Sequence, residues 1–344
     1  MSFILQRKRH RRFLKSIKRR KKYLKRKHQF SILPKKLKPY HNFIRNAISK
    51  KLPCVFSIKE NTKETLSFIN DVKNIKSKGK NIYFNMNKVS SIDEGTIALF
   101  VSIIKELSSK KYKIVGSKPK DKTARKILEK SGFFEHLDGS IDEENRTTSN
   151  TILTEGQSKT EQETTSKIVR KSINFLTGQE NSNCRFRLQR LFIELMANAI
   201  DHGFKDRKNA KWFMSYSEGN KDSEKICKFA FVDNGRGIVE TLKMKDIFEK
   251  VWQKIYSIFK GDSELLFSAF KGEIGSRTGL EYRGKGLPTI YETLQDNIIS
   301  NLFVLTNRVI LDFKNQKFYS IDVDYKGTFY YFELSNKNLE KNDN

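Results

Sequence analysis

Three short segments in the second half of the chain carry side chains suited to phosphate chemistry. In the first, Glu194, Asn198 and His202 follow one another at intervals of four within a helical pattern of apolar residues. Residues four apart share one helix face, so a carboxylate, an amide and an imidazole line up. A carboxylate can orient or deprotonate a water, and an amide oxygen suits Mg²⁺, which also takes phosphate oxygens. The alternative is a polar stripe on a half-buried helix.

The second segment, Asp233-Asn234-Gly235-Arg236-Gly237, follows the short apolar strand pattern of residues 228–232. Glycine permits positive φ angles and a close approach of the backbone to a ligand. An aspartate at a strand end can accept a hydrogen bond from an exocyclic amine such as that of adenine. The alternative is a hairpin turn, because Asp-Asn-Gly is common turn chemistry.

The third segment runs from Arg283 to Pro288, is rich in glycine and precedes a helical pattern at 287–294. Backbone N–H groups at a helix N-terminus favour phosphate, and Lys285 adds positive charge. The segment is not a Walker A loop, because that motif's spacing and its Lys-Ser/Thr pair are missing.

Together the three segments resemble the GHKL ATPases, the family of DNA gyrase, a heat-shock chaperone, histidine kinases and MutL. The resemblance covers roughly residues 160–335 and implies an α/β sandwich, a mixed sheet with one helix layer, that holds ATP and Mg²⁺. It makes Glu194 the general base and Asn198 the residue that holds Mg²⁺. It assigns nucleotide binding, besides Asn198, to eight residues: Asp233, Gly235, Gly237, Gly284, Lys285, Gly286, Leu287 and Thr328.

Within the family, the Glu194–Asn198–His202 spacing looks most like the anti-sigma-factor serine kinases. Autophosphorylation on histidine is not expected, because no histidine lies in a His-Glu motif on a long preceding helix. The stretch 239–282 is long for a lid over the phosphates, and the sequence assigns it no function.

Residues 52–137 show alternating strand and helix patterns, which predict a βαβ domain with a mostly parallel sheet. Residues 91–99, with Gly132-Phe133, resemble the STAS domain of anti-sigma-factor antagonists. In that family a phosphorylatable serine follows the aspartate at a helix start. Here Glu94 and Gly95 follow Asp93, and Thr96 is the nearest hydroxyl, so a phospho-switch is not expected.

The net charge of +29 is concentrated at the N-terminus. Residues 1–51 hold 20 Lys and Arg and no Asp or Glu, and 14 of the 21 residues in 7–27 are basic. Such a segment would bind a polyanion by counterion release, and RNA, DNA and an anionic membrane surface are all candidates. The alternative is a solvated tail.

The remaining sequence features indicate where the protein is located and how the chain divides into parts. Three widely spaced cysteines, no long apolar run and no secretory leader pattern favour a cytoplasmic protein. We expect five parts: a basic extension (1–51), a STAS-like domain (52–137), a polar linker (138–163), a GHKL ATP-binding domain (164–335) and a polar tail (336–344). The sequence assigns no oligomeric state.

The sequence thus predicts an ATP-binding regulatory protein, a Mg²⁺-dependent ATPase or a protein kinase acting on Ser or Thr. A STAS-type protein, or the chain's own STAS-like domain in cis, would be its partner. The alternative is a nucleotide-gated binding module. Its basic arm would anchor it to nucleic acid or an anionic membrane, without useful turnover.

Overall fold

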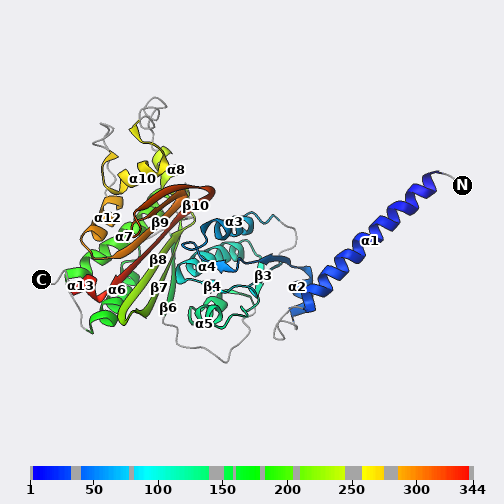
Figure 1. Ribbon diagram of the computed structural model, residues 1–344, viewed down its shortest axis with the longest axis horizontal. Helices are drawn as coiled ribbons and strands as arrows, with labels where there is room; N and C mark the ends of the chain where they lie inside the picture. The colour runs from blue at the N-terminus through cyan, green and yellow to red at the C-terminus, as the bar shows by residue number, and fades with distance from the viewer. Residues whose placement is uncertain are drawn as a thin grey trace.

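The protein is described from a computed structural model. The structure describes residues 3–31, 40–76, 81–138, 151–157, 160–178, 183–203, 210–244, 258–274 and 286–340. The chain begins with a 29-residue helix, α1 (Phe3–Ser31), which projects away from the rest of the molecule (Figure 1). The short helix α2 (His41–Asn46) follows, and its Ile44 packs against Tyr83 and Val115 of the next unit.

The N-terminal unit is built on two small parallel sheets. The larger has the strand order β1 (Ile48–Lys51), β3 (Asn81–Asn85) and β5 (Lys113–Gly116). The smaller pairs β2 (Val55–Phe56) with β4 (Ser91–Ile92). Four helical segments pack around them: α3 (Thr62–Lys73), α4 (Glu94–Ser109), α5 (Lys122–Lys130) and the 3₁₀ helix η2 (Phe133–His136). The parallel α/β arrangement predicted from the sequence is therefore confirmed, with β1 placed just before residue 52.

The second unit contains a five-stranded sheet in the order β6-β7-β8-β10-β9. Its strands are β6 (Thr151–Gln157), β7 (Lys211–Lys221), β8 (Glu224–Asp233), β9 (Ser300–Asp312) and β10 (Lys317–Ser335). All four pairings between these strands are antiparallel, so the prediction of a mixed sheet was wrong for the described strands.

The sequence predicts four shorter strands here, at 301–306, 308–314, 317–323 and 327–334, and the structure joins them in pairs into β9 and β10. Irregularities in the β9–β10 register, such as the one between Tyr325 and Thr328, shift the pairing without ending the strand. The edge strand β6 forms within the range predicted as a polar linker, where it pairs with β7.

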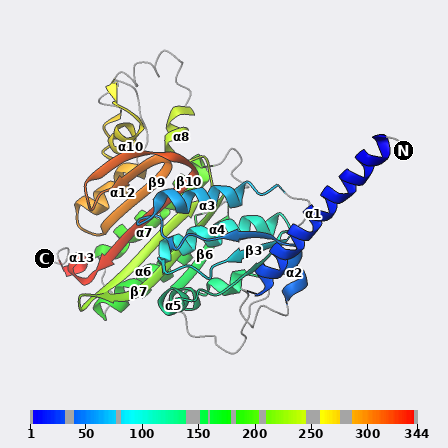
Figure 2. The same ribbon diagram turned by 45° about the vertical axis from the view of Figure 1, so that its right-hand side comes forward.

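Helices cover one face of this sheet: α6 (Gln162–Thr177), α7 (Asn183–His202) and α12 (Gly286–Gln295), as Figures 1 and 2 show. Their apolar residues form one core with Trp212, Phe229 and Phe332 of the strands. Two more helices, α8 (Ile238–Met244) and α10 (Asp262–Phe270), pack at the β9 end of the sheet, and α13 (Asn336–Glu340) follows β10. The sequence also shows helical patterns at 242–259 and 263–270; the second coincides with α10, and the first lies mostly outside the described residues.

The N-terminal unit covers the opposite face of the sheet. Successive side chains of a strand point to opposite faces, and the alternate residues Phe213, Val232 and Phe329 belong to the core of α3 and α4. The prediction of one helix layer is therefore incomplete, because this sheet is buried on both faces. The two units share one hydrophobic core.

Candidate nucleotide site

Helix α7 carries the first of the three segments. Its apolar residues, among them Leu191, Leu195 and Ala199, are buried against the sheet. Glu194 and Asn198 lie on the less buried side, as the spacing of four requires. Among the described residues, no side chain pairs with the Glu194 carboxylate.

Helix α12 packs alongside α7 and brings the third segment to Glu194 and Asn198. The Arg190 guanidinium donates to Thr289 Oγ1 at 3.2 Å, and Arg187 pairs with Asp296 just after α12. A Cβ added at Gly286 would lie 2.8 Å from Asn198 Oδ1 and 3.0 Å from Glu194 Oε2. Only glycine fits there without displacing these groups.

Leu287, the residue after Gly286, is buried in the helix layer and anchors the first turn of α12. Gly284 and Lys285, predicted to bind phosphate, lie outside the described residues. Asn198 Nδ2 is buried and has no hydrogen-bond partner among the described residues. A buried amide N–H group without an acceptor costs free energy. An oxygen of a bound ligand that accepts a hydrogen bond from Asn198 Nδ2 would remove that cost.

The second segment packs against the other end of α7. The Arg236 N–H donates to the Gly203 carbonyl oxygen at 2.7 Å, just beyond the last residue of the helix. A Cβ on Gly235 would come within 2.4 Å of that same oxygen, so the turn and the helix end touch through backbone alone. Asp233 is buried, and its Oδ1 accepts a hydrogen bond from the Gly235 N–H at 2.9 Å.

Thr328, which the GHKL resemblance assigns to nucleotide binding, lies beside Asp233. The two residues are paired in the register of β8 and β10, and Thr328 hydrogen-bonds to the Asp233 carboxylate. Gly327 has a φ angle of 132°, and a Cβ there would lie 2.2 Å from the Asp233 carbonyl oxygen. Burial raises the pKa of Asp233 to about 6, although the Gly235 and Thr328 hydrogen bonds oppose this shift.

Gly237 closes the turn against a residue that the sequence did not single out. Its φ angle is 90°, and a Cβ there would lie 2.4 Å from Asn307 Oδ1. Asn307 Nδ2 donates to the Arg236 carbonyl at 2.8 Å, and Asn307 Oδ1 accepts from the Glu240 N–H at 3.2 Å. The one sequence feature that set Asn307 apart is its position between the predicted strands 301–306 and 308–314.

The arrangement has the chemistry to hold a nucleotide with Mg²⁺. The rise of α7 from the level of Glu194 to that of Gly203 is roughly 14 Å, so the helix separates the Asp233–Gly237 turn from Glu194 along its axis. Asp233 lies beside Gly203 at the end of α7, and Glu194 and Asn198 lie beside Gly286 at the start of α12. The part of the chain that the structure describes contains no cluster of three His, Cys, Asp or Glu side chains around a possible metal. Mg²⁺ would therefore need phosphate oxygens, which it prefers.

The N-terminus of α4, where the STAS resemblance places its switch residue, lies inside the contact between the units. A Cβ on Gly95 would approach the Phe329 ring to 3.0 Å, and Glu94 forms an ion pair with Lys228 at 3.4 Å. The buried Thr96 hydroxyl donates to Asp93 Oδ2 at 2.8 Å and accepts from a backbone N–H at 2.9 Å. Thr96 is therefore not available for phosphorylation in this arrangement.

Comparison with known families identifies the N-terminal unit. Residues 53–152 match the STAS domain, which confirms the resemblance seen at residues 91–99. No GHKL ATPase family match accompanies it, and no curated protein matches the chain. A STAS domain suggests a regulatory role of the partner-switch kind. Each helix in the described parts of the chain is too short or too polar to cross a lipid bilayer.

Proposed function

We propose that this chain is an ATP-binding regulatory protein of the GHKL type whose nucleotide site is coupled to a STAS domain. One observation carries the proposal: Gly286 at the start of α12 lies against Glu194 and Asn198 of α7. Three segments far apart in the sequence thus meet along one helix, because the Asp233 turn packs on the end of the same helix.

Each residue has a distinct role in this proposal. Asp233 accepts a hydrogen bond from the adenine amine, and the neighbouring Thr328 holds that carboxylate in place. Asn198 holds Mg²⁺ together with the phosphates. Glu194 orients a water or a protein hydroxyl toward the γ-phosphate. The first turn of α12 directs its N–H groups at the phosphates.

ATP supplies a γ-phosphoryl group, which water or a serine or threonine hydroxyl would accept. Because Thr96 is buried and doubly hydrogen-bonded, the chain's own STAS domain does not present its nearest hydroxyl to the site. We therefore place the acceptor on a separate protein, of the STAS type, in preference to the domain in cis.

The test is incubation of the full-length protein with γ-labelled ATP and Mg²⁺, beside Glu194→Ala and Asn198→Ala variants. Glu292→Ala, an exposed change on α12, is the matched control. We expect released phosphate, or label on an added STAS-type protein, that is lost in the two site variants and kept in the control. Turnover that persists in both site variants would refute the assignment, as would a wild-type protein that neither binds nor consumes ATP.

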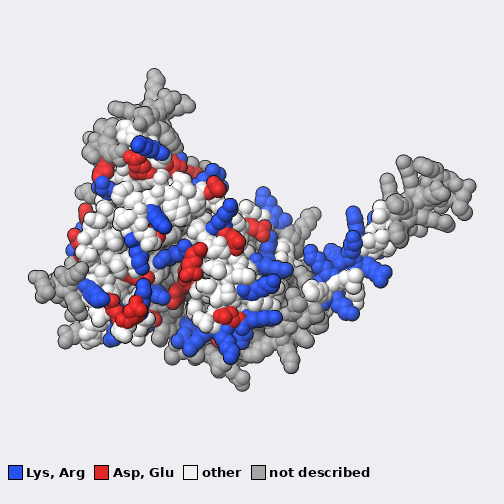
Figure 3. All heavy atoms as spheres, viewed as in Figure 1, with Lys and Arg blue, Asp and Glu red and all other residues white. Residues whose placement is uncertain are grey.

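Helix α1 supports the second candidate, an anchored module in which nucleotide binding changes contacts without useful turnover. Its residues 14–28 include nine Lys and Arg and no acid, and most of their side chains are exposed. Figure 3 shows these basic side chains on a helix that stands clear of the body. Leu14, Tyr23 and Leu24 are also exposed along it. Such a surface fits a polyanion such as RNA, DNA or an anionic membrane.

Deletion of residues 1–31 separates the two candidates. If the deletion removes salt-sensitive binding to heparin, used as a model polyanion, and leaves ATP turnover unchanged, α1 is an independent anchor on an enzyme. An anchored module without turnover predicts ATP binding, no phosphate release and polyanion affinity that changes when ATP is added.

A further inference from the structure

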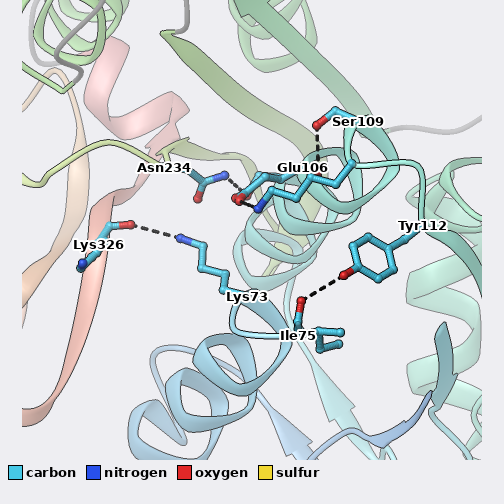
Figure 4. A network of polar contacts seen from close by, with 9 residues as sticks. Lys73, Ile75, Glu106, Ser109, Tyr112, Asn234 and Lys326 are labelled. Carbon is cyan, nitrogen blue, oxygen red and sulfur yellow. Dashed lines mark hydrogen bonds and ion pairs between the residues drawn. The ribbon is translucent and has the colours of Figure 1, made fainter. Parts of the chain in front are cut away.

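The STAS domain contacts residues next to the turn that begins at Asp233 (residues 233–237). Lys73, the last residue of α3, donates from Nζ to the Lys326 carbonyl oxygen at 3.1 Å, as Figure 4 shows. The same ammonium group lies 5.0 Å from the centre of the Tyr325 ring. Tyr325 in turn donates from its hydroxyl to the Asp233 carbonyl oxygen at 3.2 Å. A chain of contacts thus runs from the STAS domain to the backbone of the predicted adenine-binding residue.

A second bridge comes from α4. Asn234, the residue after Asp233, donates from Nδ2 to Ser102 Oγ at 3.2 Å. Ser102 is fully buried and its own hydroxyl donates to the Leu99 carbonyl, so this acceptor is fixed in position. Two helices of the STAS domain therefore contact the surroundings of Asp233, α3 through Lys326 of β10 and α4 through Asn234 of the turn.

The charges around this contact make Lys73 the cation that stabilises the Asp233 carboxylate. Glu106 of α4 and Lys110, the residue after that helix, face Lys73, and they also pair with each other at 2.6 Å. Asp324 approaches Lys73 from β10. Asp233 itself lies near three hydroxyl-bearing side chains, those of Tyr325, Thr328 and Tyr330. Desolvation raises the pKa of Asp233, and the positive charge of Lys73 lowers it.

We propose that Lys73 is a positioning residue for the nucleotide site, through which the STAS domain sets the affinity for ATP. It holds the β10 backbone beside Asp233, and its charge favours the carboxylate form that accepts the adenine amine. The inference rests on the proposed ATP-binding function. Since coupling between sites is reciprocal, nucleotide binding must also tighten the hold of the STAS domain on the turn.

The dependence of affinity on pH distinguishes this role from a purely structural one. Burial lowers the pKa of Lys73 to about 8, so this side chain is charged between about pH 6 and pH 7. Without its charge, the Asp233 carboxyl would hold its proton to a higher pH, because Lys73 lowers the pKa of Asp233. Binding of the adenine amine then requires a higher pH.

The experiment titrates full-length protein with a non-hydrolysable ATP analogue and Mg²⁺ by calorimetry, at about pH 6 and about pH 7.5. We compare the wild type with Lys73→Met, with Lys73→Arg and with the control Lys59→Met. Lys59 is matched because it lies in the same contact between the units, 4.1 Å from the Tyr331 ring centre, but faces Glu333 in place of Asp233.

We expect Lys73→Met to bind the analogue several-fold more weakly than the wild type at about pH 6, because more of its Asp233 is protonated there. At about pH 7.5 the two should differ by less than about twofold. Lys73→Arg should restore most of the affinity at the lower pH, and Lys59→Met should follow the wild type at both.

An equal loss at both pH values, or the same loss in Lys59→Met, would overturn the inference and leave the ATP site standing. Unchanged affinity in Lys73→Met would do the same. If the wild type does not bind the analogue at either pH, the proposed function falls and this inference falls with it.

Discussion

Replacing Asp233 by asparagine should stabilise the fold at neutral pH and abolish nucleotide binding. Asp233 is 3% exposed and its carboxylate is desolvated, which raises its pKa from 3.8 to about 6. An asparagine keeps an oxygen that can accept from the Gly235 N–H, but it carries no charge that must be buried. It also presents an amide N–H₂ group that cannot accept from the adenine amine.

The size of the effect follows from the two pKa values. The folded chain binds more protons than the unfolded chain between pH 3.8 and about 6, so stability falls as the pH rises through this window. A difference of about two pKa units corresponds to about 3 kcal/mol of lost stability at pH 7, all of it present above the folded pKa. At about pH 5 roughly half of this loss has disappeared.

Urea unfolding of the full-length wild type and Asp233→Asn, at about pH 7.5 and about pH 5, measures the difference. We expect the variant to be the more stable protein by a few kcal/mol at the higher pH, with the gap about 1.4 kcal/mol smaller at the lower pH. Asp93→Asn is the matched control, because burial also raises the pKa of Asp93 but its side chain caps α4. It should retain ATP binding.

Two results would refute the reasoning. A variant less stable than the wild type at both pH values would show that the Asp233 carboxylate contributes more through its hydrogen bonds than its burial costs. A variant that is stabilised but still binds ATP with wild-type affinity would separate the buried carboxylate from nucleotide recognition.

Three further changes test other parts of the argument. Gly286→Ala places a methyl group 2.8 Å from Asn198 Oδ1. The affinity for ATP should therefore fall about tenfold or more, while the circular dichroism spectrum stays unchanged. Wild-type affinity in this variant would contradict the geometry. Thr96→Val removes a buried hydroxyl bonded to Asp93 and should lower the free energy of unfolding by about 1–3 kcal/mol, and a neutral effect would contradict it. Deletion of residues 1–31 should leave the melting temperature unchanged, since α1 projects from the body; a lower value would show that α1 packs on it.

The local parts of the site were predictable because short-range rules determine them. The period of apolar residues in α7 places Glu194 and Asn198 on one face, and the glycines mark where backbone must approach closely. The sequence could not show that Asn307 would close the turn at Gly237, since that contact joins the turn to a strand residue 70 positions further along the chain. The edge strand β6 was missed because its residues are mostly polar and gain their order from pairing with β7.

The sequence does contain a pattern that indicates burial of both sheet faces, although the prediction of one helix layer did not take it into account. Strands exposed on one face alternate apolar and polar residues, whereas strands covered on both faces have continuous apolar runs. Trp212-Phe213-Met214 in β7, residues 229–232 in β8 and residues 329–332 in β10 are such runs. They indicate that a second layer must cover the sheet. Which part of the chain forms that layer depends on tertiary contacts that no local pattern encodes.

The core shared by the two units has a consequence for synthesis on the ribosome. The apolar faces of α3 and α4 are complete once residue 109 has emerged, but the strand β10 that covers part of them begins at residue 317. At ordinary elongation rates this interval lasts roughly 10–40 s. During that time the nascent STAS domain exposes apolar surface that the strands later cover, and such surface makes a nascent chain prone to aggregation and dependent on chaperones. The order of translation therefore makes this protein a candidate chaperone client at each round of its production.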